Sequence, residues 1–241
     1  MNKEYILHKS ESRGFSNHGW LKSAHTFSFA NYHNAERIHF GVLRVLNDDN
    51  VAPGMGFGSH PHENMEIISI PLDGALEHQD SMGNHSIIKN GDIQVMSAGK
   101  GIYHSEYNSN KDTPVSFLQI WIFPNKKNVD PRYYQITLDK TNRINKLQQI
   151  LSPNPEDDGV WIYQDAWFHL GNFDKNSTES YTTKKELNGM YLFIINGGIK
   201  VDDEIILNKR DGLGIKNKNQ INFISLENNT EVLLMDIPMQ N

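Results

Sequence analysis

Cysteine is absent from all 241 residues, which excludes disulfides, thiolate metal ligands and cysteine nucleophiles together. Any metal would therefore rest on nitrogen and oxygen ligands. Long hydrophobic runs are also absent, because stretches such as YLFII at 191–195 are far too short to span a bilayer. The first residues, MNKEYILHKSESRG, lack the apolar core of a secretory signal. We expect a cytoplasmic protein that does not bind membranes.

Basic clusters are lacking as well. The formal net charge is −6, and neither half of the chain carries a block of like charges. Direct nucleic-acid binding through a basic face is therefore not expected. The acidic balance leaves room for a protein partner but does not indicate one.

Strand-like segments make up most of what is present. Apolar residues come in short runs separated by Asn, Asp and Gly pairs, and long helical periodicity is scarce. The clearest hairpin is LEHQDSMGNHSIIKNGDIQVM, with turns at Gly83-Asn84 and Asn90-Gly91. This pattern predicts an all-β protein built from sandwiches or barrels.

A change of composition divides the chain. The stretch DKTNRINKLQQILSPNPEDDGV at 139–160 contains Pro153, Pro155 and Gly159. We expect a linker there, between one domain at 1–138 and another at 161–241. Both flanking units are rich in strand-like runs, which predicts a duplicated architecture.

Two short clusters carry candidate metal ligands. In HPHENME, His60, His62 and Glu66 have the same parity, so on one strand they would point to the same face. In SAGKGIYHSEYN, His104 and Glu106 again share a face. Two strands could therefore close around one ion. Three imidazoles and a carboxylate suit Fe(II), Mn, Co, Ni, Cu or Zn, and the ligand types alone do not choose among them.

The other histidines have simpler interpretations. His78 shares parity with Asp80, which predicts a structural hydrogen bond. His85 lies beside a turn and is expected to be solvated. The second unit holds only His169 and has no paired ligand motif, so no second metal site is expected there.

The spacing of these clusters resembles two cupin motifs. Gly54, His60, His62, Glu66 and Gly74 follow the first motif, with one extra residue before the final Gly. GDIQVMSAGKGIYHSEYN is similar to the second motif, with two residues inserted before the His. This segment and HPHENMEIISIPLDGALEHQDSMGN resemble sequences of the pirin family, a branch of the bicupins. HTFSFANY, SFLQIWIFP and DPRYYQ resemble the bacterial pirin-like quercetin 2,3-dioxygenases over most of the chain.

The resemblance implies two tandem cupin barrels of jelly-roll type. The N-terminal barrel would bind one divalent transition metal through His60, His62, His104 and Glu106, and the C-terminal one would be a degenerate cupin without ligands. Iron is the metal expected first, with Mn, Co, Ni, Cu or Zn as alternatives. Glu66 is the fourth ligand in generic cupins. Here we expect Glu66 not to bind the metal itself but to orient one of the ligand imidazoles by accepting a hydrogen bond from it.

The resemblance also implies an activity. A flavonol such as quercetin would be cleaved with O2 to a depside and carbon monoxide, and Glu106 would take the proton of the substrate hydroxyl. Candidates for the substrate pocket are Phe27, Phe29, Phe57 and Met65. Two alternatives remain: a metal-dependent regulatory protein that binds a partner, and a cupin enzyme for a different small enol.

Overall fold

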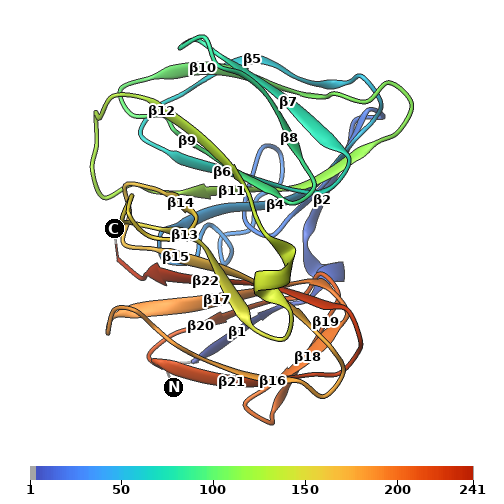
Figure 1. Cartoon of the computed structure of the whole chain (residues 1–241), viewed down its shortest axis with the longest axis vertical. Coiled ribbons are helices and arrows are strands. Elements are labelled where there is room, and N and C mark those ends of the chain that lie inside the picture. Colours follow the sequence, from blue (N-terminus) through green and yellow to red (C-terminus); the bar gives the residue numbers. More distant parts are fainter. Residues whose placement is uncertain (1–3, 241) are drawn as a thin grey trace.

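The computed structural model describes residues 4–240, which form 22 strands and two short 3-10 helices, η1 (Ser10–Ser12) and η2 (Lys140–Arg143). Among these residues no helix is long and apolar enough to cross a membrane. The strands form four sheets, arranged as two barrels stacked one above the other (Figure 1). The all-β bicupin prediction is confirmed.

The first barrel, at the top of Figure 1, closes a seven-stranded sheet against a four-stranded one. In spatial order the larger sheet contains β12 (Arg132–Thr137), β9 (Asp92–Ser97), β6 (Glu66–Asp73), β11 (Val115–Ile122), β4 (Leu43–Val51), β3 (Leu21–His25) and β2 (Gly14–Asn17). The smaller sheet contains β5 (Gly56–His62), β10 (Ile102–Asn108), β7 (Ala75–Asp80) and β8 (His85–Lys89).

The second barrel repeats this division. Its larger sheet contains β1 (Tyr5–His8), β20 (Gly212–Ile215), β17 (Asn188–Asn196), β22 (Thr230–Pro238), β15 (Trp167–Phe173), β13 (Leu147–Ser152) and β14 (Val160–Trp161). Its smaller sheet contains β16 (Thr178–Thr182), β21 (Gln220–Ser225), β18 (Gly198–Val201) and β19 (Ile205–Asn208).

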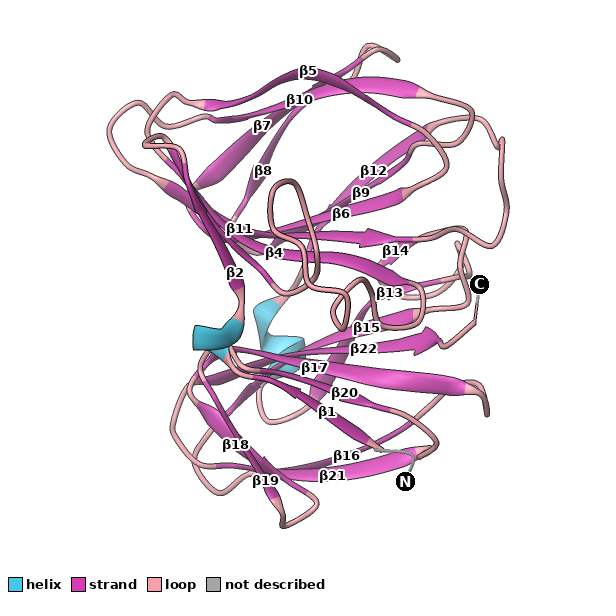
Figure 2. Cartoon of the chain, turned by 180° about the vertical axis from the view of Figure 1, so that it is seen from behind, coloured by secondary structure: helices cyan, strands magenta, loops and turns pink. Residues whose placement is uncertain are grey.

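The largest apolar core lies between the two seven-stranded sheets, which face each other in the middle of the molecule (Figure 2). On β11, Leu118 and Ile120 belong to this core, while Leu233 and Met235 reach it from β22. These strands are buried on both faces, which is why they appear in the sequence as nearly continuous apolar runs.

The interiors of the two barrels differ in polarity. Inside the second barrel, Met190, Leu192 and Ile194 alternate along β17 and pack with other apolar side chains. Inside the first barrel, the corresponding inward positions of β6, β10 and β11 include the polar residues Ser69, Glu106 and Gln119, all buried. The second barrel also buries polar side chains, among them His169, Tyr181 and Asp236, but the groups of three candidate metal donors found in residues 4–240 lie in the first.

Two segments lie differently from their expected places. The first strand, β1, pairs antiparallel with β20 and so completes the sheet of the second barrel. The expected linker at 139–160 contains η2, β13 and β14, and both strands belong to the second barrel. The Pro and Gly residues of this segment mark the loop between β13 and β14 rather than a connection between domains. The division into 1–138, 139–160 and 161–241 stays a prediction.

Candidate metal centre

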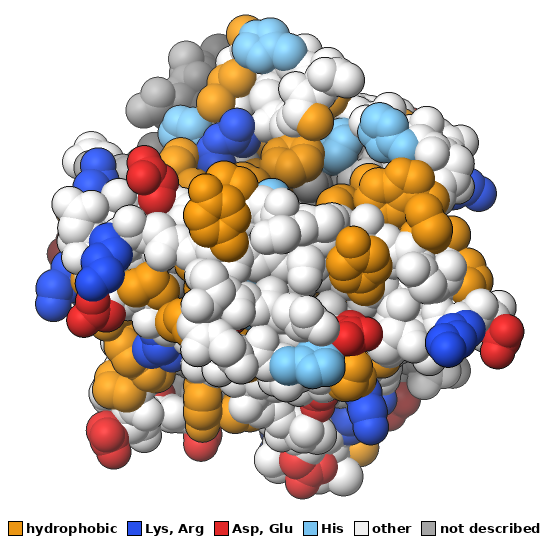
Figure 3. Space-filling view, turned by 90° about the horizontal axis from the view of Figure 1, so that it is seen from above, with side chains coloured by type: hydrophobic (Ala, Val, Ile, Leu, Met, Phe, Trp, Pro, Cys, Tyr) orange, Lys and Arg blue, Asp and Glu red, His pale blue; other side chains and the backbone are white. Residues whose placement is uncertain are grey.

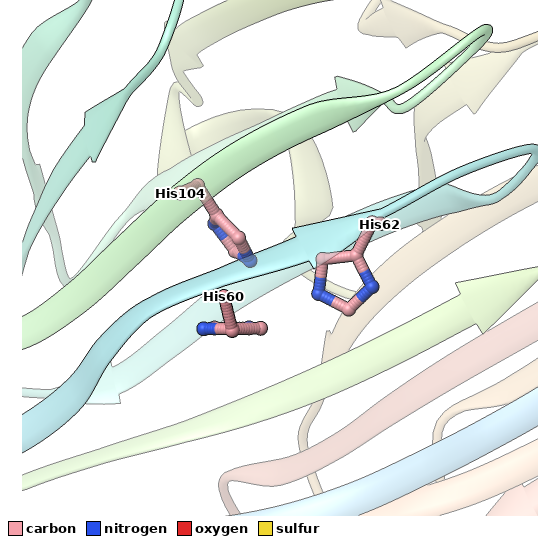
Figure 4. A group of neighbouring side chains, drawn as sticks. All are labelled: His60, His62 and His104. Carbon is pink, nitrogen blue, oxygen red and sulfur yellow. The ribbon is translucent and has the colours of Figure 1, made fainter.

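Two neighbouring strands place three histidines on the inward face of the first barrel. His104 of β10 lies opposite His60 of β5, and Ile102 lies opposite His62. Because side chains alternate along a strand, His60 and His62 point inward while Pro61 between them is exposed. Figure 4 shows the three imidazoles turned toward one another, two from β5 and one from β10. Their ring centroids are 4.5–5.0 Å apart.

The nitrogen atoms of these rings are free to bind a metal. One ring nitrogen from each histidine lies within 4.8 Å of the other two. Nδ1 of His60 donates a hydrogen bond of 2.8 Å to the carbonyl oxygen of Gly58, which leaves its Nε2 with a free lone pair. Both ring nitrogens of His104 are buried without any hydrogen-bond partner. Buried polar atoms are rarely left this way unless a ligand satisfies them, so the residues fit a metal ion.

Burial keeps His62 and His104 in the neutral form that binds metals. It lowers the pKa of His62 to about 4. It also lowers the pKa of His104 to about 2, helped by the neighbouring His60 and His62. A protonated imidazole has no lone pair to donate, so these two uncharged rings are ready to bind a cation.

Glu106 lies deeper, next to His104. Its side chain is only 2% exposed. One carboxylate oxygen accepts a hydrogen bond of 3.0 Å from Ser69 Oγ, and the other accepts one of 2.7 Å from Gln119 Nε2. Burial raises the pKa of this carboxyl group, which makes the carboxylate a stronger base, while both donors favour the ionised form.

A second group of donor atoms lies behind the first. His78, His104 and Glu106 each offer one ligand atom, and these atoms lie within 4.8 Å of one another. His104 is therefore shared by both groups. His78 is completely buried, its Nε2 lies 3.2 Å from Asp80 Oδ2, and its ring stacks on Tyr133. The structure thus places His78 and Asp80 together, as their parity predicted.

Glu66 does not lie where the sequence pattern placed it. Strand β5 ends at His62, and the chain turns through Asn64 with φ of +46° before β6 begins at Glu66. The turn breaks the alternation, so Glu66 has the parity of Ile68, which packs against the second barrel. Its carboxylate accepts a hydrogen bond of 2.6 Å from Ser97 and no hydrogen bond from the histidines. The expectation that it orients an imidazole is wrong for this reason.

A cavity of about 260 Å³ opens beside the three histidines. Its apolar lining includes Leu21, Phe29, Phe57 and Trp121. The ring of Trp121 stands edge-on to His62, with centroids 4.9 Å apart. This position puts an aromatic surface directly beside the candidate ligands.

Two of the four predicted pocket residues line this cavity, Phe29 and Phe57. Phe27 does not, because it packs against His8 and Tyr191 in the core between the barrels. Met65 packs instead against a small cluster around Met96. For these two residues the prediction is wrong, since apolar character alone does not tell which core a side chain joins.

Sequence reasoning missed several polar residues of the cavity. Gln119 and Trp121 were not singled out, although SFLQIWIF places them two residues apart and therefore on one face of a strand. Asn47 and Asp49 follow the same rule on β4. A polar residue that alternates with apolar ones inside a buried strand was the signal that could have found them.

Seen from above the first barrel, hydrophobic side chains are mixed with polar ones, and Lys and Arg do not gather into one patch (Figure 3). Exposed aromatic residues on the outward face of β10 include Tyr103 and Tyr107.

The fold and the site together define a bicupin. Both groups of candidate metal donors found in residues 4–240 lie in the first barrel, and the second barrel is packed mainly with apolar side chains. The molecule therefore belongs to the bicupins whose two barrels differ, because the candidate metal donors lie in the first barrel.

Comparison with known proteins places the chain within this class. Residues 7–122 match the family model described as Pirin, and residues 149–237 match the one described as Quercetinase C-terminal cupin domain. The chain belongs to the pirin family. It is 39% identical to the quercetin 2,3-dioxygenase of Escherichia coli K12, over 96% of this chain and 98% of that protein. It is 41% identical to a pirin-like protein of Caulobacter vibrioides, over 92% of this chain and 95% of that one.

A solved structure has the same architecture. The bacterial pirin YhhW of Escherichia coli, crystallised in complex with nickel(II), superimposes with a TM-score of 0.91 at 37% identity. The match covers 97% of this chain and 99% of that one. A relative with this fold therefore binds a divalent metal.

Proposed function

We propose that the first barrel binds one divalent transition metal through His60, His62, His104 and Glu106 and that it cleaves a flavonol such as quercetin with O2. The observation that carries this proposal is the convergence of three imidazoles next to a buried carboxylate, at the wall of a cavity lined with aromatic residues. The names of the relatives support the same reaction class.

The donor set determines which ions fit. Nitrogen and carboxylate donors suit Fe(II), Mn, Co, Ni, Cu and Zn. The nickel complex of a relative supports a divalent ion, and iron remains our first expectation. When bound, such an ion supplies a Lewis acid that holds a substrate oxygen as its anion.

The residues of the chain then have separate tasks. Phe57 and Trp121 provide flat apolar surfaces that position a planar substrate and exclude water. Glu106 accepts the proton of the substrate hydroxyl, because burial has made its carboxylate more basic. Ser69 and Gln119 keep that carboxylate in place through one hydrogen bond to each oxygen.

The proposed reaction balances without another reactant. The two carbon–carbon bonds of the carbon that carries the flavonol hydroxyl break, and this carbon leaves with its oxygen as carbon monoxide. Both atoms of O2 remain in the depside. Each is bonded to one of the two carbons that were attached to the carbon released. No external reductant is needed, because the substrate supplies all the electrons.

Carbon monoxide release tests the proposal. The purified protein is loaded separately with Fe(II), Mn, Co, Ni and Cu, and quercetin is added in air. We expect release that depends on the metal, is lost in His62→Ala, and is retained in His85→Ala, whose exposed side chain contacts only Glu77. Full metal loading without any carbon monoxide would overturn the flavonol assignment and favour another small enol as the substrate.

A further inference from the structure

The cavity has a second polar wall, formed by strands β2, β3 and β4. It contains Ser16, Ser23, His25, Asn47 and Asp49. Four of these side chains are almost completely buried: Ser23, His25 and Asn47 are each 2% exposed and Asp49 is 4% exposed. These strands belong to the larger sheet, whereas the histidine cluster lies on β5 and β10 of the smaller one.

Hydrogen bonds inside this wall fix the direction of its donors. The amide oxygen of Asn47 lies 3.0 Å from Nδ1 of His25 and can only accept, so Nδ1 carries the proton. Nε2 of His25 then accepts from the hydroxyl of Ser16 at 3.1 Å. The hydroxyl of Ser23 donates to Oδ1 of Asp49.

Two polar atoms of this wall are left over. Within residues 4–240, Oδ2 of Asp49 and Nδ2 of Asn47 have no hydrogen-bond partner, although both residues line the cavity. Asn47 and Asp49 are two residues apart on β4, so their side chains point to the same face. An acceptor and a donor therefore lie side by side. Both residues line the cavity, so a group that enters it can bond to these two atoms.

The cavity also has an apolar part, while Gln119, which lies opposite Asn47 in the sheet and bonds to Glu106, connects the two polar walls. Leu21, Phe57 and Trp121 all contribute to its lining. The cavity thus offers metal donors on one sheet, flat hydrophobic surfaces, and a paired acceptor and donor on the other sheet.

We propose that Asn47 and Asp49 form a second binding subsite, which takes a hydroxyl group of the substrate other than the enol that faces the histidines. The substrate class is then a planar aromatic enol that carries at least one further phenolic hydroxyl. This inference rests on the proposed function, since it assumes that the substrate enol faces His60, His62 and His104. A hydroxyl both donates and accepts, so one such group satisfies Oδ2 of Asp49 and Nδ2 of Asn47 together.

Binding without turnover tests the subsite. Nickel-loaded protein is titrated under anaerobic conditions with quercetin, which carries hydroxyls on its outer rings, and with 3-hydroxyflavone, which has only the enolic one. The variants Asp49→Leu and Asn47→Leu keep a similar volume but remove the polar atoms. Asn50→Ala is the matched control, because Asn50 lies on the opposite face of the same strand and bonds to Ser116. Circular dichroism and nickel content confirm that each variant is folded and loaded.

We expect wild-type protein to bind quercetin about tenfold more tightly than 3-hydroxyflavone. In Asp49→Leu and Asn47→Leu the ratio of the two Kd values should fall toward one, while the Kd for 3-hydroxyflavone stays within about twofold. Asn50→Ala should keep the wild-type ratio. An unchanged ratio in both Leu variants overturns the subsite.

Carbon monoxide release, measured separately, distinguishes the two proposals. If the ratio of the two Kd values depends on Asp49 but no carbon monoxide is released, the dioxygenase reaction is refuted and the subsite is retained. Release with the same discrimination in wild-type and both Leu variants would retain the reaction and refute the subsite.

Discussion

Gln119 Nε2 donates a hydrogen bond of 2.7 Å to Glu106, and this bond joins the two sheets of the first barrel across its interior. Gln119 lies on β11 of the larger sheet and Glu106 on β10 of the smaller one. The position of the carboxylate relative to His104 is therefore set by both sheets, not by β10 alone.

Replacing Gln119 by Leu should weaken nickel binding by about tenfold or more, because residues that orient a metal ligand typically contribute this much to affinity. Competition with a chelator of known affinity measures the change. Gln79→Leu is the control, since Gln79 is exposed on the outer face of β7 and bonds to Glu77. Equal affinities in wild-type and Gln119→Leu would show that Glu106 needs no support from the larger sheet.

The two buried glutamates should behave differently toward a metal. Glu106→Gln should lower nickel affinity, because an amide is a weaker ligand than a carboxylate. Glu66→Gln should leave it unchanged, since Glu66 bonds to Ser97 on the face toward the second barrel. Isothermal titration of both variants makes the comparison. A loss of affinity in Glu66→Gln alone would reverse the assignment.

His169 should make the protein less stable in acid. Burial lowers its pKa to about 3 in the folded state, from 6.5 when unfolded. Between these values the unfolded chain binds a proton that the folded chain does not, so stability is full above pH 6.5 and falls as the pH decreases. The loss attributable to His169 is about 1 kcal/mol per pH unit.

Urea unfolding of wild-type and His169→Gln at pH 7, 6 and 5 measures this effect. The free energy of unfolding of the wild type should fall relative to the variant as the pH decreases. A constant difference over this range would mean that the imidazole has the same pKa in the folded and the unfolded protein.

Asp49 should reduce stability at neutral pH. Burial raises its pKa to about 7, from 3.8 in the unfolded chain. Between these values the folded state holds a proton that the unfolded state has lost, so the stability contributed by Asp49 is present below pH 4 and is lost as the pH rises to 7. Asp49→Asn should therefore stabilise metal-free protein by about 4 kcal/mol at pH 8 and by little at pH 4. Thermal unfolding at the two pH values measures this, and equal shifts at both would contradict it.

Local patterns predicted the parts of the site that depend on a single strand. The spacing of His60 and His62, and that of His104 and Glu106, follows from the alternation of side chains, which needs no tertiary information. The apolar runs and turn residues likewise predicted an all-β fold. Membership in a known family supplied the rest of the architecture.

The sequence predictions were wrong for residues whose position depends on distant parts of the chain. Glu66 was assigned to the strand of His62 because a turn at Asn64 does not show in the alternation. Phe27 was assigned to the pocket because it is aromatic, but it lies beyond the end of β3 and packs in the core between the barrels. The pairing of β1 with β20 has no local signal, since hydrogen bonds between backbones carry no sequence pattern.

That pairing has a consequence for synthesis. The strand Tyr5–His8 leaves the ribosome long before its partner Gly212–Ile215 is made. The larger sheet of the second barrel is therefore completed only after Thr230–Pro238 has been translated. A nascent chain that stalls near residue 138 would carry an unpaired strand edge able to join another chain, so interrupted translation should yield aggregates rather than a free metal-binding barrel.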